Sequence, residues 1–243
     1  MTNIRDLLPP RSVLPLTCHF IAILWQVGAI TTGGRFVKGC IRMIPVLFFV
    51  TLFGYELFAE NYNTAIRKIE ERLNLIKSAS NKFNIDYKIL CSIIYTERTV
   101  NYDWEDDALD KILANVGLNS SMGFCQIKLK TAYWIERQLN DSTSVHFPGK
   151  KYESILSVSK SKRELIMKLT NDSLNVLYAS AYLRIMISRW EKEGFSIDDR
   201  PDIIGTLYST GLFKSNGEER IPNRHPNPND FGKGVLKALS LFE

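Results

Sequence analysis

Two hydrophobic runs near the N-terminus constrain this chain more than any other feature. Residues 12–34 contain no Asp, Glu, Lys or Arg, and such a run is long enough to cross the roughly 30 Å hydrocarbon layer as a helix. The second run, residues 43–59, is shorter and more apolar, and Glu56 interrupts it. The sequence therefore predicts a membrane anchor in residues 1–60, made of one or two transmembrane helices. The alternative is a buried helical hairpin of a water-soluble protein.

Basic residues between the two runs predict how the anchor is oriented. Arg35, Lys38 and Arg42 lie there, and basic loops tend to stay in the cytoplasm. If the second run spans the membrane, alone or with the first, the chain after Glu60 emerges on the outer side. If only the first run spans, the rest of the chain stays inside. A cleaved signal peptide fits less well, because no clear small-x-small cleavage pattern follows the runs.

The composition of the whole chain is that of a globular protein with a real core. Of 243 residues, 45% are hydrophobic and 23% are charged, which argues against general disorder. The net charge of +5 suits an anionic partner such as a cell-wall polymer, a lipid headgroup or nucleic acid, without choosing between them. Nucleic acid is the weakest of these partners, because no basic stripe or recognised binding motif is present.

Residues 61–243 carry mainly helical patterns. Ile66, Ile69, Leu73 and Ile76 are spaced three or four apart, which predicts one amphipathic helix over 63–83. Residues 84–86 form a break that ends in Asp86, a typical helix N-cap. Further helices are predicted over 88–97, 124–139, 173–194, 201–211 and near the C-terminus. Strands amount at most to a small hairpin between Asn101 and Ser121, so the predicted fold class is mainly α.

Cysteine and histidine spacing predicts neither a structural metal nor a cofactor. The chain has no CxxC pair, and its histidines have no ligand spacing. Cys91 and Cys125 are either plain core residues or the two halves of a disulfide. The remaining cysteines and histidines are scattered: Cys18, Cys40, His19, His146 and His225.

Glu97 ends an apolar stripe. Ile89, Ile93 and Glu97 are four residues apart, so on a helix the carboxylate continues the buried face. A carboxyl at the margin of a core has its charged form disfavoured and its pKa raised, as a general acid near neutral pH requires. The alternative is a solvated boundary residue beside Arg98.

Four separated segments resemble motifs of the lytic transglycosylase and goose-type lysozyme superfamily, in the same order. They are "ASNKFNIDYKILCSIIYTER", "SSMGFCQIKLKTA", "NVLYASAYL" and "LYSTG", within residues 79–211. The resemblance implies a lysozyme-like helical domain over residues 61–243. It also implies a bacterial protein of the inner membrane, with its catalytic domain on the periplasmic side.

The resemblance also implies roles for individual residues. Glu97 matches the catalytic glutamate, and the substrate-binding residues implied are Ser121, Gly123, Cys125, Gln126, Tyr208 and Ser209. The chain departs from the family pattern as well. Arg98 replaces a serine, Phe124 and Cys125 replace leucine and methionine, and Ser209 replaces an asparagine, while the loop from Glu97 to Gln126 is longer than usual.

The implied activity is cleavage of the MurNAc–GlcNAc β-1,4 bond of peptidoglycan with formation of 1,6-anhydromuramyl ends. One glutamate acts first as acid and then as base, and the substrate supplies the nucleophile. A hydrolytic muramidase is the first alternative, with a second carboxylate from a run of acids that is otherwise a solvated face: Asp103, Glu105, Asp106, Asp107 and Asp110. The second alternative is a catalytically inactive glycan-binding module of a cell-envelope protein complex.

Overall fold

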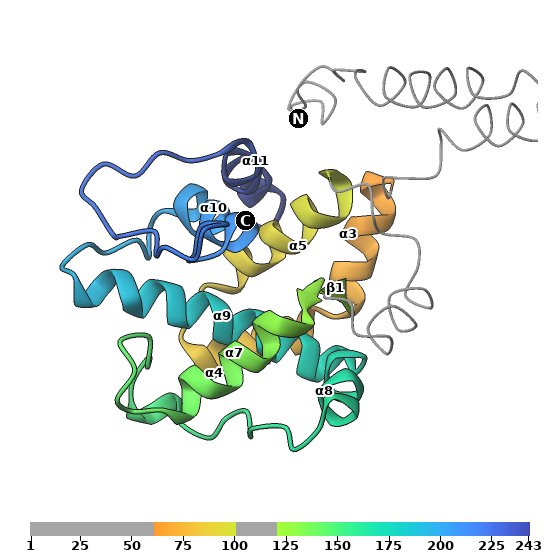
Figure 1. The fold of residues 1–243 in the computed structure, drawn as a ribbon. Helices are drawn as coiled ribbons and strands as arrows, with labels where there is room; N and C mark the ends of the chain where they lie inside the picture. The colour runs from red at the N-terminus through yellow and green to blue at the C-terminus, as the bar shows by residue number, and fades with distance from the viewer. Residues whose placement is uncertain (1–60, 101–120) are drawn as a thin grey trace, which may run out of the picture. The chain divides into compact units, whose positions relative to one another are not determined.

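A long central helix, α9 (Asp172–Lys192), organises the fold in the computed structural model, which describes residues 61–100 and 121–243 (Figure 1). Every residue from Asn175 to Trp190 is buried. The side chain of Asn171 caps the helix by accepting the backbone N–H of Leu174 at 3.1 Å. Because α9 is buried on all sides, it forms the core that the other helices cover. The described residues belong to one compact unit, Phe58–Glu243.

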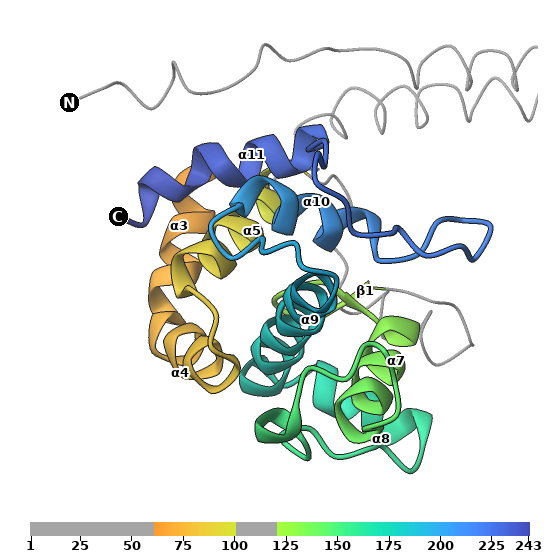
Figure 2. The same cartoon turned by 90° about the vertical axis from the view of Figure 1, so that its left-hand side faces the viewer.

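The helices around α9 come from both ends of this unit. Viewed nearly along its axis, α9 has α4 on one side, α7 and α8 on the other, and α10 above it (Figure 2). The described part of the chain is thus mainly helical, as predicted. Its elements are α3 (Tyr62–Glu71), α4 (Leu73–Phe83), α5 (Tyr87–Val100), β1 (Ser121–Met122), β2 (Ile127–Lys128), α7 (Leu129–Asn140), η3 (Lys150–Tyr152), α8 (Lys162–Leu169), α9, α10 (Pro201–Thr210), α11 (Asp230–Ala238) and η4 (Leu239–Leu241).

The single helix predicted over 63–83 is wrong, because the chain breaks it into α3 and α4 at Arg72. Arg72 leaves the helical region with φ −110° and ψ 9°, and its N–H bonds to the carbonyl oxygen of Ile69. Its Nε donates to Asp172 at the start of α9, at 2.7 Å. The bend therefore points the Arg72 side chain at the central helix.

The predicted break before the Glu97 helix is confirmed. Asn84 adopts the left-handed conformation with φ 52°, and the N–H of Ile85 bonds back to the carbonyl of Ser80. Asp86 then accepts the N–H of Lys88 at 2.9 Å and caps α5. The helix continues past Glu97 to Val100.

A small hairpin begins at Ser121, the last residue of the segment in which one was predicted. Antiparallel β1 and β2 pair Ser121 with Lys128 and Met122 with Ile127. The helix predicted from Phe124 is also wrong in its start, since α7 begins at Leu129. Gly123 and Gln126 have φ angles of 71° and 52°, which a right-handed helix does not allow, and they form the hairpin turn instead. Residues 101–120 lie outside the described residues.

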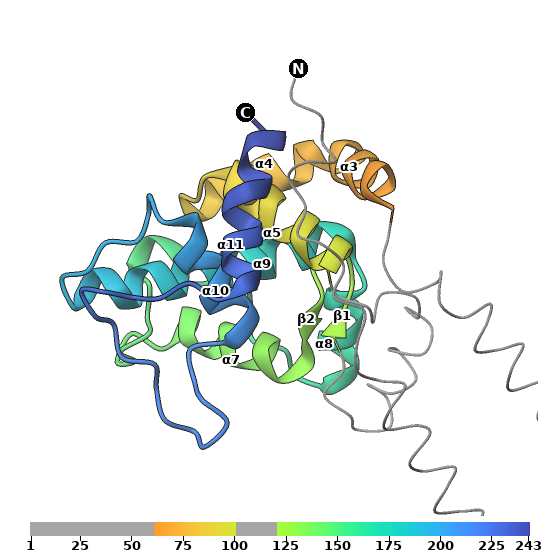
Figure 3. The same ribbon diagram turned by 90° about the horizontal axis from the view of Figure 1, so that it is seen from above.

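The C-terminal helices pack closely on α5. Pro201 begins α10 and Gly211 ends it, which confirms the predicted start and stop signals. Figure 3 looks down on α11, which lies over α5 and α10. A Cβ on Gly232 would overlap the carbonyl oxygen of Asp202 and the hydroxyl of Thr206, so α10 and α11 approach each other at a position that requires glycine.

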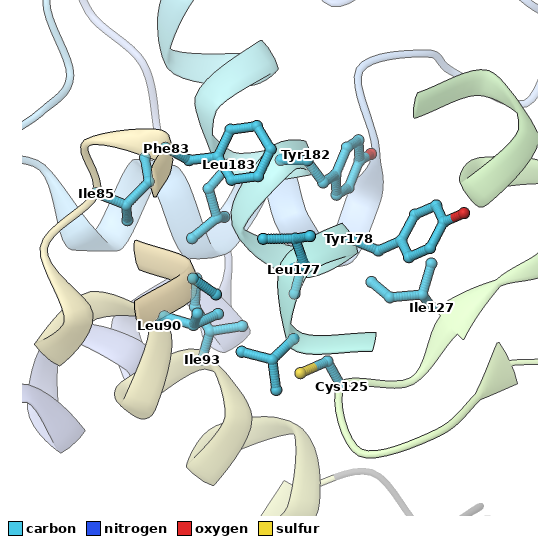
Figure 4. Close-up of a cluster of buried hydrophobic side chains, with 14 of the residues drawn as sticks. Phe83, Ile85, Leu90, Ile93, Cys125, Ile127, Leu177, Tyr178, Tyr182 and Leu183 are labelled. Carbon is cyan, nitrogen blue, oxygen red and sulfur yellow. The ribbon is translucent and has the colours of Figure 1, made fainter. Parts of the chain in front are cut away.

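The core joins α4, α5, the hairpin and α9. Figure 4 shows Phe83, Leu90, Ile93 and Leu183 in one cluster, with the sulfur of Cys125 pointing into it. Within residues 61–100 and 121–243, no helix has both the length and the apolar character needed to span a bilayer. The two N-terminal hydrophobic runs lie outside the described residues, and their membrane role stays a prediction.

Candidate active site

Glu97 lies in the last turn of α5, where it is half-buried. The residues one turn earlier, Ile93 and Ile94, are fully buried, so the carboxylate stands at the margin of the core as predicted. Its charge acts on groups from two other elements. Burial raises the pKa of Tyr208 well above its usual range, and the nearby Cys125 and Glu97 raise it further. Burial likewise raises the pKa of the Cys125 thiol, with a contribution from Glu97. Glu97 thus lies within electrostatic range of Cys125 and Tyr208.

The hairpin turn of residues 123–126 lies at the centre of this group. The Tyr208 hydroxyl donates to the carbonyl oxygen of Cys125 at 2.7 Å, which joins α10 to the turn. Gln126 donates from Nε2 to the carbonyl of Gly123 at 3.3 Å, so its amide braces the turn. Two predicted substrate-binding side chains therefore also hold the backbone beside Glu97 in one conformation.

Asn175 fixes the turn from the core side. Its Oδ1 accepts the N–H of Cys125 at 2.6 Å, and its Nδ2 donates to the carbonyl oxygens of Met122 and Leu169, each at 2.9 Å. A Cβ on Gly123 would overlap both the Leu169 carbonyl oxygen and the Asn175 amide. The turn therefore sits directly against α9. The sequence analysis placed Asn175 in a motif but missed this role. The signal for it was a polar residue among the apolar residues of the helix predicted over 173–194.

Arg98 is the second residue that sequence reasoning missed. Its position after Glu97 was noted only as a departure from the family motif, whereas in the structure it is 3% exposed and packs against the turn. Its guanidinium carbon lies 5.0 Å from the centroid of the Phe124 ring, and Nη1 donates to the Phe124 carbonyl at 3.5 Å. The guanidinium of Arg72 lies 4.8 Å from the same ring centroid. Two cations thus hold the Phe124 side chain of the turn.

The thiols near the site are free and buried, which decides between the two interpretations of Cys91 and Cys125. Both are core residues and no disulfide joins them. Burial raises the pKa of Cys91 to about 12, so this thiol stays protonated at neutral pH. Burial raises the pKa of the Cys125 thiol in the same direction, so both thiols are in their protonated, less nucleophilic form at neutral pH.

The two predicted serines have different surroundings. Ser121 is half-buried in β1, opposite Lys128. Ser209 is exposed near the end of α10; it donates to the Thr206 carbonyl at 3.1 Å and accepts from Nδ2 of Asn229 at 2.9 Å. Since Asn229 also caps α11, Ser209 supports the junction of α10 and α11.

Two further predictions concern a second carboxylate and the absence of a metal site. The acidic residues from Asp103 to Asp110 lie outside the described residues, so a second carboxylate is neither placed nor removed. In the described ranges, no group of three or more His, Cys, Asp or Glu side chains is placed to hold a metal ion.

Comparison of the chain with protein-family models and with curated protein sequences gives no match. A functional assignment therefore rests on the residues and their geometry.

Proposed function

We propose that residues 61–243 are a lysozyme-like lytic transglycosylase domain that cleaves the MurNAc–GlcNAc bond of peptidoglycan. Residues 1–60 would hold it at the outer face of a bacterial inner membrane. The observation that carries the proposal is the placement of Glu97, half-buried at the end of an apolar stripe and within electrostatic reach of Tyr208 and the 123–126 turn. The four motifs that resemble the superfamily supply most of these residues.

Glu97 performs both proton transfers in this mechanism. Its carboxyl group is partly withdrawn from water, so it loses some of the hydration that stabilises the charged form. As an acid it protonates the glycosidic oxygen while positive charge develops on the sugar ring. As a carboxylate it then takes the proton from the C6 hydroxyl of the same muramyl residue, whose oxygen closes the anhydro ring. Because the nucleophile belongs to the substrate, the second step is intramolecular.

The rigid turn supports the positioning that this chemistry needs. Its backbone is held by Asn175 from the core and by Tyr208 from α10. A turn that is fixed before the substrate arrives does not have to reorganise during the reaction, which favours the transition state. The Gln126 amide, which gives one N–H to the Gly123 carbonyl, would then offer its oxygen to an acetamido group of the sugar as a hydrogen-bond acceptor.

The departures from the family pattern favour one second candidate, a glycan-binding module without activity. Arg98 is buried against Phe124 where the family has a serine, and Ser209 bonds Asn229 where the family has an asparagine. These changes alter the surroundings of Glu97 but keep the carboxyl group itself. A hydrolytic muramidase is distinguished from both by its products.

Mass spectrometry of soluble products tests the proposal. Residues 61–243 and the Glu97→Gln variant are incubated with purified peptidoglycan, beside Glu70→Gln, which makes the same change at an exposed position of α3. We expect anhydro-ended fragments from the wild type and from Glu70→Gln, and none from Glu97→Gln. Fragments with reducing ends would assign a hydrolase instead. Normal product yield from Glu97→Gln would overturn the assignment of the acid, and binding without products would favour the inactive module.

A further inference from the structure

A series of aromatic rings leads away from Tyr208 to the molecular surface. The ring centroids of Tyr208 and Tyr182 are 5.9 Å apart, those of Tyr182 and Trp134 are 6.2 Å apart, and those of Trp134 and Phe213 are 6.1 Å apart. The rings come from α10, α9, α7 and the chain that follows α10. Tyr182 is buried, Trp134 is half-buried and Phe213 is 39% exposed. The series therefore starts at the candidate active site and ends in solvent.

Phe213 is held in a fixed position although it lies in a long connection. It forms an antiparallel bridge with Glu219, and the N–H of Arg220 bonds to the carbonyl of Leu212 at 2.7 Å. Glu219 in turn accepts from Nε of Arg189 on α9 at 2.7 Å, and its carboxylate lies 2.9 Å from Nε2 of His146. These contacts fix the backbone at Phe213, and packing on Trp134 and His146 fixes its ring, before any ligand binds, which lowers the entropic cost of binding.

The arrangement of the rings suits a sugar. The face of an aromatic ring carries partial negative charge, and the C–H groups on the face of a pyranose carry partial positive charge. A flat, exposed ring therefore attracts a sugar face. Glu219 pairs with Phe213 along the backbone, and its carboxylate, held by Arg189, adds a polar acceptor to this part of the connection. A small number of polar groups around an aromatic surface is typical of ligand sites.

We propose that Trp134 and Phe213 form a glycan subsite for the part of the strand that extends beyond the bond next to Glu97. This inference takes its ligand from the proposed function, because a polymer cut at Glu97 continues past the cut and needs a surface to lie on. The ring series links this subsite to Tyr208 and so to the candidate active site. Long strands would bind more tightly than short ones, and Phe213 would carry part of the difference.

Calorimetric titration of the full chain in detergent tests the subsite. The Glu97→Gln protein, which does not consume its ligand, is titrated with chitotriose and with chitohexaose. Adding Phe213→Ala should weaken hexamer binding about tenfold, the value of one aromatic contact, and weaken trimer binding less. Adding Phe213→Tyr, which keeps the ring, should leave hexamer affinity unchanged. Met167→Ala removes an apolar side chain of α8 that is 64% exposed, against 39% for Phe213, and should also have no effect.

Three results would overturn the subsite. These are equal hexamer affinity in the Phe213→Ala and Met167→Ala proteins, no hexamer binding by the Glu97→Gln chain, and a trimer loss as large as the hexamer loss. The outcome is separable from that of the proposed function. If hexamer binding depends on Phe213 but the chain that retains Glu97 releases no product, the subsite is supported and the proposed activity is contradicted. If the products are normal but hexamer binding does not depend on Phe213, only the subsite is contradicted.

Discussion

Arg98, the residue after the candidate acid, contacts Phe124 in the hairpin turn through both the ring and the backbone carbonyl. The superfamily motifs that the chain resembles have a serine and a leucine at these positions. Because the two differing residues touch each other, they amount to one local difference from those motifs. This chain has a large cation in place of a small hydroxyl, and an aromatic ring that attracts cations in place of an aliphatic side chain.

A double-mutant cycle on residues 61–243 measures this pairing. Arg98→Ser and Phe124→Leu should each lower the free energy of unfolding in urea. The loss in free energy of unfolding of the double variant should be smaller than the sum of the two single losses by about 1–2 kcal/mol, because a desolvated cation–π contact has this strength. The control pair is Lys151, which is exposed, and the buried Tyr152, with 4.8 Å between cation and ring centroid; because the lysine stays in water, the coupling should be below about 1 kcal/mol. Strict additivity at Arg98 and Phe124 would contradict the pairing.

Gly123 allows the hairpin turn to lie against α9. Gly123→Ala should lower the free energy of unfolding by more than about 3 kcal/mol, since it adds an overlap with Asn175 and Leu169 to the strain of a positive φ. Gly217 also has a positive φ, but a Cβ there meets nothing within 4 Å. Gly217→Ala should therefore lower the free energy by only about 1 kcal/mol. Urea unfolding of both variants checks this, and equal losses would mean that the close approach is unimportant.

The parts of the fold that depend on local chemistry could be predicted from the sequence. Pro201, Gly211, Asn84 and Asp86 mark helix ends because their backbone geometry or side chains act on neighbouring residues. The break at Arg72 could not be predicted, because the side chain there is directed by Asp172, which is distant in sequence. Tertiary contacts of this kind override a continuous helical period.

The candidate site, like the fold, could be predicted only where it depends on local sequence. Periodicity along a single helix predicted Glu97 at the margin of the core. The burial of Arg98 and the three hydrogen bonds of Asn175 depend on partners in other elements. A pattern within one helix contains no information about such partners, so neither contact could be predicted from the sequence.

The buried thiols predict resistance to alkylation. Burial raises the pKa of Cys91 to about 12 and that of Cys125 as well, so at pH 8 both stay protonated and unreactive in the folded chain. Iodoacetamide at pH 8 should leave both unmodified, and in urea both should react. Peptide mapping by mass spectrometry separates them from Cys18 and Cys40. Rapid labelling of Cys91 or Cys125 in the folded protein, or a disulfide between them, would contradict the structure.

Glu219 predicts a pH dependence of stability. Burial alone would raise its pKa, but hydrogen bonds from Arg189 and His146 outweigh burial, so the pKa lies below its ordinary value of 4.5. A lowered pKa stabilises the fold above pH 4.5, and this contribution disappears as the pH falls through the folded-state value. Glu219→Gln should lower the free energy of unfolding by about 1–3 kcal/mol at pH 7.

The difference between wild type and Glu219→Gln should therefore shrink as the pH is lowered below 4.5, as measured by urea unfolding at several pH values. Glu218→Gln is the matched control, because Glu218 pairs with Lys214 in an exposed position and should matter little. A difference between wild type and Glu219→Gln that stays constant from pH 7 to pH 3 would contradict the ion pairs at Glu219.

Removal of the Tyr208 hydroxyl should reduce activity more than it reduces stability. Tyr208→Phe removes the donor to the Cys125 carbonyl, so the free energy of unfolding should fall by about 1 kcal/mol. Under the proposed function, the turn beside Glu97 would lose its fixed position, and peptidoglycan cleavage should slow by about 10- to 100-fold. Tyr62→Phe, the same change at an exposed position of α3, should alter neither quantity.

The alkaline side of the rate profile separates positioning by Tyr208 from a proton transfer by it. Burial, with a contribution from the nearby Cys125 and Glu97, raises the pKa of Tyr208 well above 10, so the hydroxyl keeps its proton and continues to donate throughout the neutral and mildly alkaline range. Its contribution should disappear only as the pH rises through that elevated value. The ratio of wild-type to Tyr208→Phe rates should therefore be constant from pH 6 to pH 9. A ratio that falls within this range would show that Tyr208 titrates, and a ratio of one throughout would mean that its hydroxyl does not position the site.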